Sequence, residues 1–360
     1  MANFKDELSP ALAGALGSEL QMAWPEFPLQ AWSDAATSGL EQLELMARSA
    51  HLARALTLCL PLPFPEAAAV LGRALESPTF TGWMVLPCGQ FVAQQGIDHP
   101  DVALPLLAGL TRRSSSEFPI RPFIERHPES TFRYLHQWTG HPDEHVRRLV
   151  SEGTRPRLPW APVLRGLIDD PSPSIALLDR LFDDDSAYVR RSVANHLNDI
   201  SKDHPDLALA CAARWLAGSS HGDGVVRHGL RTLVKRGDPQ ALRLLGYGHS
   251  NEVTLVEFTV SPPAITIGGE VTLTAVLSAE DDTRAAIDYL VHYQGVRGLK
   301  PGKVFKLTSR ALPAGDRVAV TKRHRFDHVS IRTIRPGLHR VELQVNGRVL
   351  GSADITINAR

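Results

Sequence analysis

The chain has 360 residues, of which 43% are hydrophobic, 22% charged and 6% aromatic, and its formal net charge at pH 7 is zero. At about 100–200 residues per domain, this length predicts two or three domains. The balanced charge excludes a histone-like basic protein and a protein built around an acidic tail. The three cysteines lie far apart in the sequence, which argues against a disulfide scaffold, a CxxC redox pair and a cysteine-rich zinc site.

The beginning of the chain gives no sign of a targeting segment. Residues 1–7 carry acids and no apolar stretch, so we expect no signal peptide. No apolar run reaches the roughly 18 residues that a membrane helix needs. We therefore expect a soluble cytoplasmic protein that makes no contact with membranes.

Charge is unevenly distributed along the chain. Residues 1–110 carry a net charge of −7, residues 111–250 a net charge of +3 and residues 251–360 a net charge of +4. The basic excess in the middle and at the end indicates a polyanionic partner. An ordinary solvated surface would give the same pattern, so charge alone leaves both interpretations open.

The two parts of the chain have different hydrophobic periods. Residues 40–57 and similar stretches up to residue 250 have apolar residues at helical spacing. Beyond residue 251 short β-branched runs alternate apolar and polar residues, and Asn346-Gly347 between two such runs predicts a tight hairpin. We predict a mainly α fold: a HEAT-like helical-repeat solenoid over 1–250, then an all-β immunoglobulin-like sandwich over 251–360, with the junction at 246–251.

A short phrase recurs in the helical part. It reads DEHVRRLV at residues 143–150, SAYVRRSV at 186–193 and DGVVRHGL at 223–230. The shared valines lie 43 and 37 residues apart, which is the period of paired helices in HEAT-type repeats. We expect the first residue of each phrase to cap a helix and the valine to face the core.

Stacked repeats would place the basic residues that follow each valine in a ladder along one face. Such a ladder suits a phosphate backbone. In the alternative, each arginine pairs with an aspartate of the adjacent repeat, and the sequence leaves both interpretations open. The residues concerned are Arg147, Arg148, Arg190, Arg191, Arg227 and His228.

Several common catalytic motifs are missing. The sequence has no GxGxxG or GxxxxGK[ST] phosphate loop and no GxSxG nucleophile motif. His141 and His145 lie four residues apart, but no third ligand accompanies them, so we interpret them as part of a helix start. We predict no metal site.

Two segments carry polar residues that simple repeats do not need. Residues 152–160 contain Gly, Pro and Arg and end at Trp160, which could stack on a nucleic-acid strand or, alternatively, fill a groove between helices. Residues 189–205 predict a helix with a polar stripe opposite its apolar face. That stripe contains Arg191, Asn195, Asn198, Asp199 and Lys202.

Four stretches, residues 116–125, 146–160, 188–205 and 226–237, resemble the AlkC family of bacterial alkylpurine DNA glycosylases. These enzymes belong to the HEAT-like-repeat superfamily that also includes AlkD, and some carry a C-terminal Ig-like domain. The resemblance implies hydrolysis of the N-glycosidic bond of cationic alkylated bases, 3-methyladenine and 3-methylcytosine, without a cofactor and without full base flipping. A cationic base is already a good leaving group, so the enzyme has mainly to stabilise the oxocarbenium-like sugar.

The resemblance also implies site residues. Glu117 or Glu152 would supply the catalytic carboxylate, and Trp160 an aromatic wall for the cationic base. Asp199 would line the same cleft and hold water. AlkD relatives carry Trp at the positions of Glu117 and Asn195, so the AlkD pocket does not transfer directly. Candidate DNA contacts are Arg148, Arg155, Arg157, Arg190, Arg191, Asn195, Lys202, Arg227, Arg231 and Lys235.

The β half has a basic cluster of its own, in residues 322–328 with Arg332 and Arg335. It could reach DNA phosphates, and a solvated strand edge is the alternative. The implied partner is duplex DNA with alkylated bases. We expect a monomer without an obligate protein partner, because no heptad run is visible.

Two other functions stay open at this point. One is a non-catalytic HEAT-repeat scaffold that binds DNA or protein, and the other is a glycosylase for different bulky or charged lesions. A scaffold should tolerate Glu152→Gln and Asp199→Asn, whereas an enzyme should lose turnover and still bind DNA.

Overall fold

The structure is a computed structural model that describes residues 4–218, 221–248, 252–329 and 332–359. The chain divides into two compact units: residues 1–204 with 214–229, and residues 205–213 with 230–360. Helices give way to strands between Leu244 and Val253. The predicted junction at residues 246–251 falls partly outside the described residues, because 249–251 are not among them.

The first unit consists of short helices joined by tight turns. Three 3-10 turns accompany them: η1 (Phe4–Glu7), η2 (Leu40–Gln42) and η3 (Gly82–Met84). A further helix, α13 (Pro205–Gly218), is shared between the units. The helices are α1 (Pro10–Ala23), α2 (Leu29–Thr37), α3 (Leu45–Cys59), α4 (Phe64–Ala74), α5 (Val85–Gln95), α6 (Pro100–Thr111), α7 (Arg121–Arg126), α8 (Pro128–Trp138), α9 (Glu144–Gly153), α10 (Arg165–Asp169), α11 (Ser172–Leu181), α12 (Ala187–Asp203) and α14 (Gly222–Gly229).

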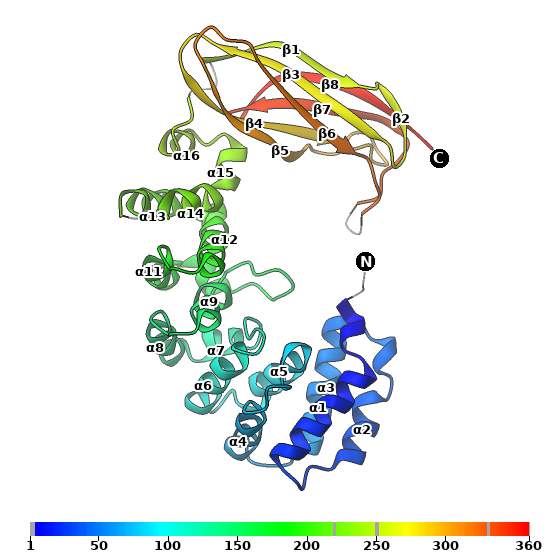
Figure 1. The fold of residues 1–360 in the computed structure, drawn as a ribbon, viewed down its shortest axis with the longest axis vertical. Helices are drawn as coiled ribbons and strands as arrows, with labels where there is room; N and C mark the ends of the chain where they lie inside the picture. The colour runs from blue at the N-terminus through cyan, green and yellow to red at the C-terminus, as the bar shows by residue number, and fades with distance from the viewer. Residues whose placement is uncertain (1–3, 219–220, 249–251, 330–331, 360) are drawn as a thin grey trace. The chain divides into compact units, whose positions relative to one another are not determined.

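These helices stack in two rows (Figure 1). In one row α4 packs on α6, α6 on α8 and α8 on α11; in the other, α9 packs on α12 and α12 on α14. Contacts of α8 and α11 with α9 join the rows. This arrangement confirms the predicted HEAT-like helical-repeat fold. In the described part of the chain no single helix is long and apolar enough to span a membrane, and only α3 and α4, taken together as a pair bent by 114°, reach that length and apolar content.

The repeated phrase explains how the second row forms. Asp143 caps α9 and Ser186 caps α12, each accepting a hydrogen bond from the backbone N–H two residues later, at 2.8 Å and 3.2 Å. The third phrase departs from the prediction, because Asp223 lies inside α14 and pairs with Arg227 at 2.7 Å. The three valines of the phrase are fully buried: Val146, Val189 and Val226.

The second unit is a sandwich of two sheets, preceded by α15 (Arg231–Arg236) and α16 (Pro239–Leu244). One sheet has the order β1-β3-β6 and the other β2-β8-β7-β4-β5. Apolar residues of both sheets meet between them, which confirms the predicted Ig-like domain. The strands are β1 (Val253–Ser261), β2 (Ala264–Thr266), β3 (Glu270–Ala279), β4 (Thr283–His292), β5 (Lys303–Leu312), β6 (Val318–Arg325), β7 (Gly337–Val345) and β8 (Arg348–Asn358).

The predicted hairpin joins β7 to β8. Val345 pairs with Arg348 across a two-residue turn at Asn346-Gly347. Both turn residues have positive φ, 45° and 82°, as a type I′ turn requires. The hairpin prediction is confirmed.

One member of the predicted basic cluster lies inside this sandwich. His324 is buried, with its ring nitrogens 3.0 Å from Tyr289 Oη and 3.1 Å from Tyr293 Oη. Burial, aided by Arg332, lowers the pKa of His324 from 6.5 to about 4. The expectation that His324 belongs to a basic surface cluster is therefore wrong: it is a neutral core residue.

Acid should weaken the fold through this histidine. Because the pKa of His324 is lowered in the folded chain, its contribution is fully present above pH 6.5 and is lost as pH falls towards about 4. We expect the free energy of unfolding to fall by roughly 3 kcal/mol across this window from His324 alone. Between pH 7 and pH 4.5, urea unfolding should show a smaller fall in the free energy of unfolding for His324→Gln than for the wild type. Equal falls in the two proteins would contradict this assignment.

Candidate active site

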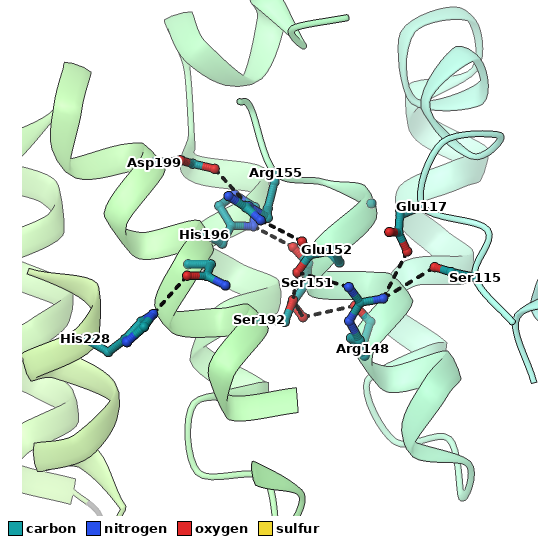
Figure 2. A network of polar contacts seen from close by, with 12 residues as sticks. Ser115, Glu117, Arg148, Ser151, Glu152, Arg155, Ser192, His196, Asp199 and His228 are labelled. Atoms are coloured by element: carbon teal, nitrogen blue, oxygen red, sulfur yellow. Dashed lines mark hydrogen bonds and ion pairs between the residues drawn. The ribbon is translucent and has the colours of Figure 1, made fainter. Parts of the chain in front are cut away.

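The site is built around the last turn of α9, where it packs against α12. Ser151 Oγ donates to Ser192 Oγ at 2.7 Å, and Ser192 Oγ donates to Glu152 Oε2 at 2.6 Å (Figure 2). The hydroxyl chain fixes the Glu152 carboxylate at the interface of the two helices. A buried carboxylate needs such partners, because an unpaired one would be costly.

A row of alternating charge passes through Glu152. We call it the carboxylate network, and Figure 2 shows most of it. Each of its acids contacts at least one of its cations. The ion pairs are Arg148–Glu117 at 2.9 Å, Arg148–Glu152 at 3.7 Å, Arg155–Glu152 at 2.6 Å, Arg155–Asp199 at 2.9 Å and Lys202–Asp199 at 2.8 Å.

Both guanidinium groups of the carboxylate network stay charged. Burial alone would lower the pKa of Arg148, but Glu117 and Glu152 outweigh it and raise the pKa. The pKa of Arg155 is raised in the same way, with burial opposed by Glu152 and Asp199. The cations therefore hold the carboxylates in fixed positions.

Three of the four predicted catalytic residues line one cavity of about 520 Å³: Glu117, Glu152 and Trp160. Most of its wall is apolar, and the two carboxylates provide the negative charge. The Trp160 side chain is 72% exposed, so the alternative that it fills a groove between helices is wrong. The remaining lining residues are Leu45, Met46, Gly82, Trp83, Leu86, Ser114, Ser115, Phe118, Arg155, Leu158 and Pro159.

The structure corrects the expected place of Asp199. Its residue exposure is 1%, and both carboxylate oxygens accept hydrogen bonds, from Arg155 Nε at 2.9 Å and Lys202 Nζ at 2.8 Å. Asp199 does not line the cavity, because Arg155 lies between them. It supports the cavity wall from behind.

Comparisons with known proteins decide the family. The family model "Uncharacterised protein YhaZ, C-terminal Ig-like domain" matches residues 254–359. The uncharacterized protein YhaZ of Bacillus subtilis (strain 168) is 34% identical, over 99% of this chain and 100% of its own length. The solved structure of Pseudomonas fluorescens alkylpurine DNA glycosylase AlkC, bound to DNA containing an abasic site analog, matches with a TM-score of 0.93. It is 34% identical and covers 99% of this chain and 100% of that chain.

This chain belongs to the AlkC family. Membership confirms the predicted resemblance, and with it the enzyme class: the chain is a DNA glycosylase. The match extends over both units, so it includes the segments that carry Glu117, Glu152 and Trp160.

Two of the predicted DNA contacts in this AlkC-family site lie within the carboxylate network and not on the surface. Arg148 and Arg155 lie inside the carboxylate network, with side chains 17% and 9% exposed. Their guanidinium groups bond carboxylates, so the structure corrects their expected role as phosphate contacts. The alternative of pairing between repeats holds for Arg147, which contacts Asp184 of the next repeat at 2.7 Å.

The other predicted contacts are spread more widely. Arg157 makes two hydrogen bonds to Asp203, at 3.0 Å and 2.8 Å. Arg190 donates to the carbonyls of the loop before α12, Asn195 Oδ1 accepts from His228 Nε2 at 2.9 Å, and Arg227 pairs with Asp223. Arg190 and Arg191 line a second hollow of about 440 Å³. Arg231 and Lys235 belong to α15 of the second unit.

The predicted polar stripe of α12 is not one exposed face. Asn198 and Asp199 are buried, whereas Arg191 and Lys202 are exposed. Sequence reasoning also missed Ser192, although a signal was present: the repeated phrase has serine there where the preceding copy has the buried Leu149. Within the described ranges no group of three or more His, Cys, Asp or Glu side chains is placed to hold a metal ion.

Proposed function

We propose that this AlkC-family glycosylase hydrolyses the N-glycosidic bonds of 3-methyladenine and 3-methylcytosine in duplex DNA. The observation that carries the proposal is the cavity in which Glu117 and Glu152 lie beside the exposed Trp160. An aromatic face and two carboxylates favour a cationic base over a neutral one. An apolar wall strengthens this preference, because it weakens screening by water.

The two carboxylates divide the work. The positive base leaves readily, so the barrier lies in the oxocarbenium-like sugar that remains. Glu152, fixed by Ser192 and Arg155, supplies negative charge opposite the sugar. Glu117 accepts from Arg148 through Oε2, and within the described residues Oε1 accepts no hydrogen bond, so Glu117 orients the attacking water.

The proposal includes how DNA is bound. Arg157, Arg190 and Arg191 contact phosphates, together with the other predicted contacts Asn195, Lys202, Arg227, Arg231 and Lys235. The cavity is open and Trp160 is exposed, so the lesion is read without full flipping of the base. The chain acts as a cytosolic monomer without cofactor or obligate protein partner. Light scattering with and without duplex DNA would test the monomeric state.

Removing the indole should reduce selectivity for charged lesions. We expect Trp160→Ala to lower kcat/KM for 3-methyladenine by about tenfold, because a cation–π contact contributes roughly 0.5–2 kcal/mol. Trp160→Phe should keep most of the activity. Stability should change little, since the side chain is 72% exposed. Single-turnover release of the base measures the effect, and unchanged rates for Trp160→Ala would contradict the role of the aromatic wall.

Product analysis tests the proposed function itself. The protein is incubated with methylated duplex DNA, and the freed bases are separated by chromatography. Release of 3-methyladenine and 3-methylcytosine is expected. Release of other bases instead would indicate a different lesion class, and no release with intact DNA binding would overturn the proposal.

A further inference from the structure

Arg121 lies at the base of the loop that carries Trp160. This arginine is 4% exposed and is the first residue of α7. Its Nη1 donates to the carbonyls of Gly153 and Arg155, at 3.0 Å and 2.8 Å, and its Nη2 donates to the carbonyl of Pro162 at 2.6 Å. One side chain therefore holds both ends of the loop between α9 and α10, which Figure 1 shows as an extended excursion from the stacked helices.

The indole itself has little to hold it in place. Trp160 is 72% exposed, so packing against neighbours does not fix it. Its φ of +66° lies in the left-handed region, which costs a residue with a side chain roughly 1–2 kcal/mol. Such a conformation persists only where the surrounding structure determines it. The position of the indole therefore depends on how the loop backbone is anchored.

The backbone anchors are few and lie at the base of the loop. Pro156, Pro159 and Pro162 restrict φ at three positions, and Leu164 N–H donates to the Pro156 carbonyl at 3.1 Å. These features stiffen the loop. Arg155 and Arg157 tie its first residues to Asp199 and Asp203 of α12. Arg121 also holds its later part, at the Pro162 carbonyl beyond Trp160, and joins it to the segment that carries Glu117, four residues earlier.

Burying the Arg121 guanidinium at this position costs free energy. Within the described ranges no carboxylate lies at ion-pair distance from Arg121, and burial lowers its pKa to about 10. A residue that only filled space would be apolar, because a buried charge without a counter-ion is costly. The planar guanidinium places donors on two separate nitrogens, Nη1 for the start of the loop and Nη2 for Pro162, whereas lysine has all its donors on one nitrogen.

We propose that Arg121 is the positioning residue of Trp160: it anchors the loop so that the indole lies at the cavity beside Glu117 and Glu152. This inference rests on the proposed function and deepens it. Arg121 is not among the residues that line the cavity. It acts on catalysis through the loop.

A double-mutant cycle tests the proposal. Arg121→Lys keeps the charge and removes the fork, and it should lower kcat/KM for 3-methyladenine about tenfold, with most of the loss in KM. In a Trp160→Ala background the same substitution should cost less than about twofold, because the indole that it positions is gone. Additive losses in the two backgrounds would overturn the proposal.

A matched control is available elsewhere in the first unit. Arg48 is also 4% exposed and donates to four backbone carbonyls, those of Lys5, Leu8, Glu41 and Leu43, at 2.7–3.1 Å. Arg48→Lys should lower the melting temperature comparably, and its effect on kcat/KM should be the same with and without Trp160. A purely structural role for Arg121 would give this same additive pattern.

A second measurement covers the case in which Arg121→Lys does not fold. Nitrogen-15 relaxation of the wild-type chain reports on the Val163 N–H, whose peptide plane contains the Pro162 carbonyl that Arg121 holds. Anchoring predicts an order parameter of about 0.85 at Val163, as in rigid backbone, and a value below about 0.6 would overturn the anchor. This test needs no activity, so it separates failure of the anchor from failure of the proposed function.

Discussion

Glu152→Gln should slow release of 3-methyladenine on the order of 100-fold or more, because it removes the negative charge that faces the developing oxocarbenium ion. The substitution preserves shape: the amide oxygen can accept from Arg155 in place of Oε1, and the amide nitrogen can donate to the Ser192 hydroxyl in place of Oε2. DNA binding should therefore change by less than about threefold. Single-turnover kinetics with excess enzyme give the rate of the chemical step apart from binding.

A carboxylate outside the cavity provides the control for this result. Glu129 is exposed on α8, and Glu129→Gln should leave the rate of base release unchanged. Glu117→Gln should also slow release and, because Glu117 orients water in the proposal, its effect should grow as the base becomes a better leaving group. Equal rates for wild type and Glu152→Gln would contradict the assignment of the catalytic charge.

Asp199→Ala should lower the free energy of unfolding by about 3 kcal/mol, since it removes one partner of a buried ion pair. Asp199 is 1% exposed and holds Arg155 at 2.9 Å, so Arg155 would keep only Glu152. Activity should also fall, because Arg155 lines the cavity and fixes Glu152. Urea unfolding, followed by circular dichroism, measures the change in stability.

The same helix offers a matched comparison. Asp203 lies one turn after Asp199 and pairs with Arg157 at 2.8 Å, but both side chains are more than a quarter exposed. Asp203→Ala should therefore cost at most about 1 kcal/mol. Similar losses for Asp199→Ala and Asp203→Ala would contradict the view that burial makes the carboxylate network structural.

The repeat and the sandwich could be predicted because their signals are local. The phrase around Val146 and Val189 set the period, and both helices begin directly after the residues expected to cap them. Asn346-Gly347 predicted a turn that depends only on two positive φ angles. The family resemblance pointed to Glu117, Glu152 and Trp160, and the structure places them in one cavity.

Side-chain pairing between repeats could not be predicted in the same way. Arg148 and Arg155 look like surface cations in the sequence, yet carboxylates from segments 31 and 44 residues away bind them. The burial of Asp199 follows from the contact of α9 with α12, which periodicity along one helix does not report. His324 was misplaced for the same reason, because its tyrosine partners belong to the other sheet: Tyr289 lies on β4 and Tyr293 directly follows it.

Conversion of a single lesion to an abasic site tests the catalytic role of the cavity most directly. A duplex with one 3-methylcytosine is incubated with excess protein without added metal, and alkali then cleaves the strand wherever the base is gone. Wild type should convert the duplex, whereas the double variant Glu117→Gln/Glu152→Gln should bind it and leave it intact. Conversion at the wild-type rate by the double variant would show that these two carboxylates are not the catalytic groups.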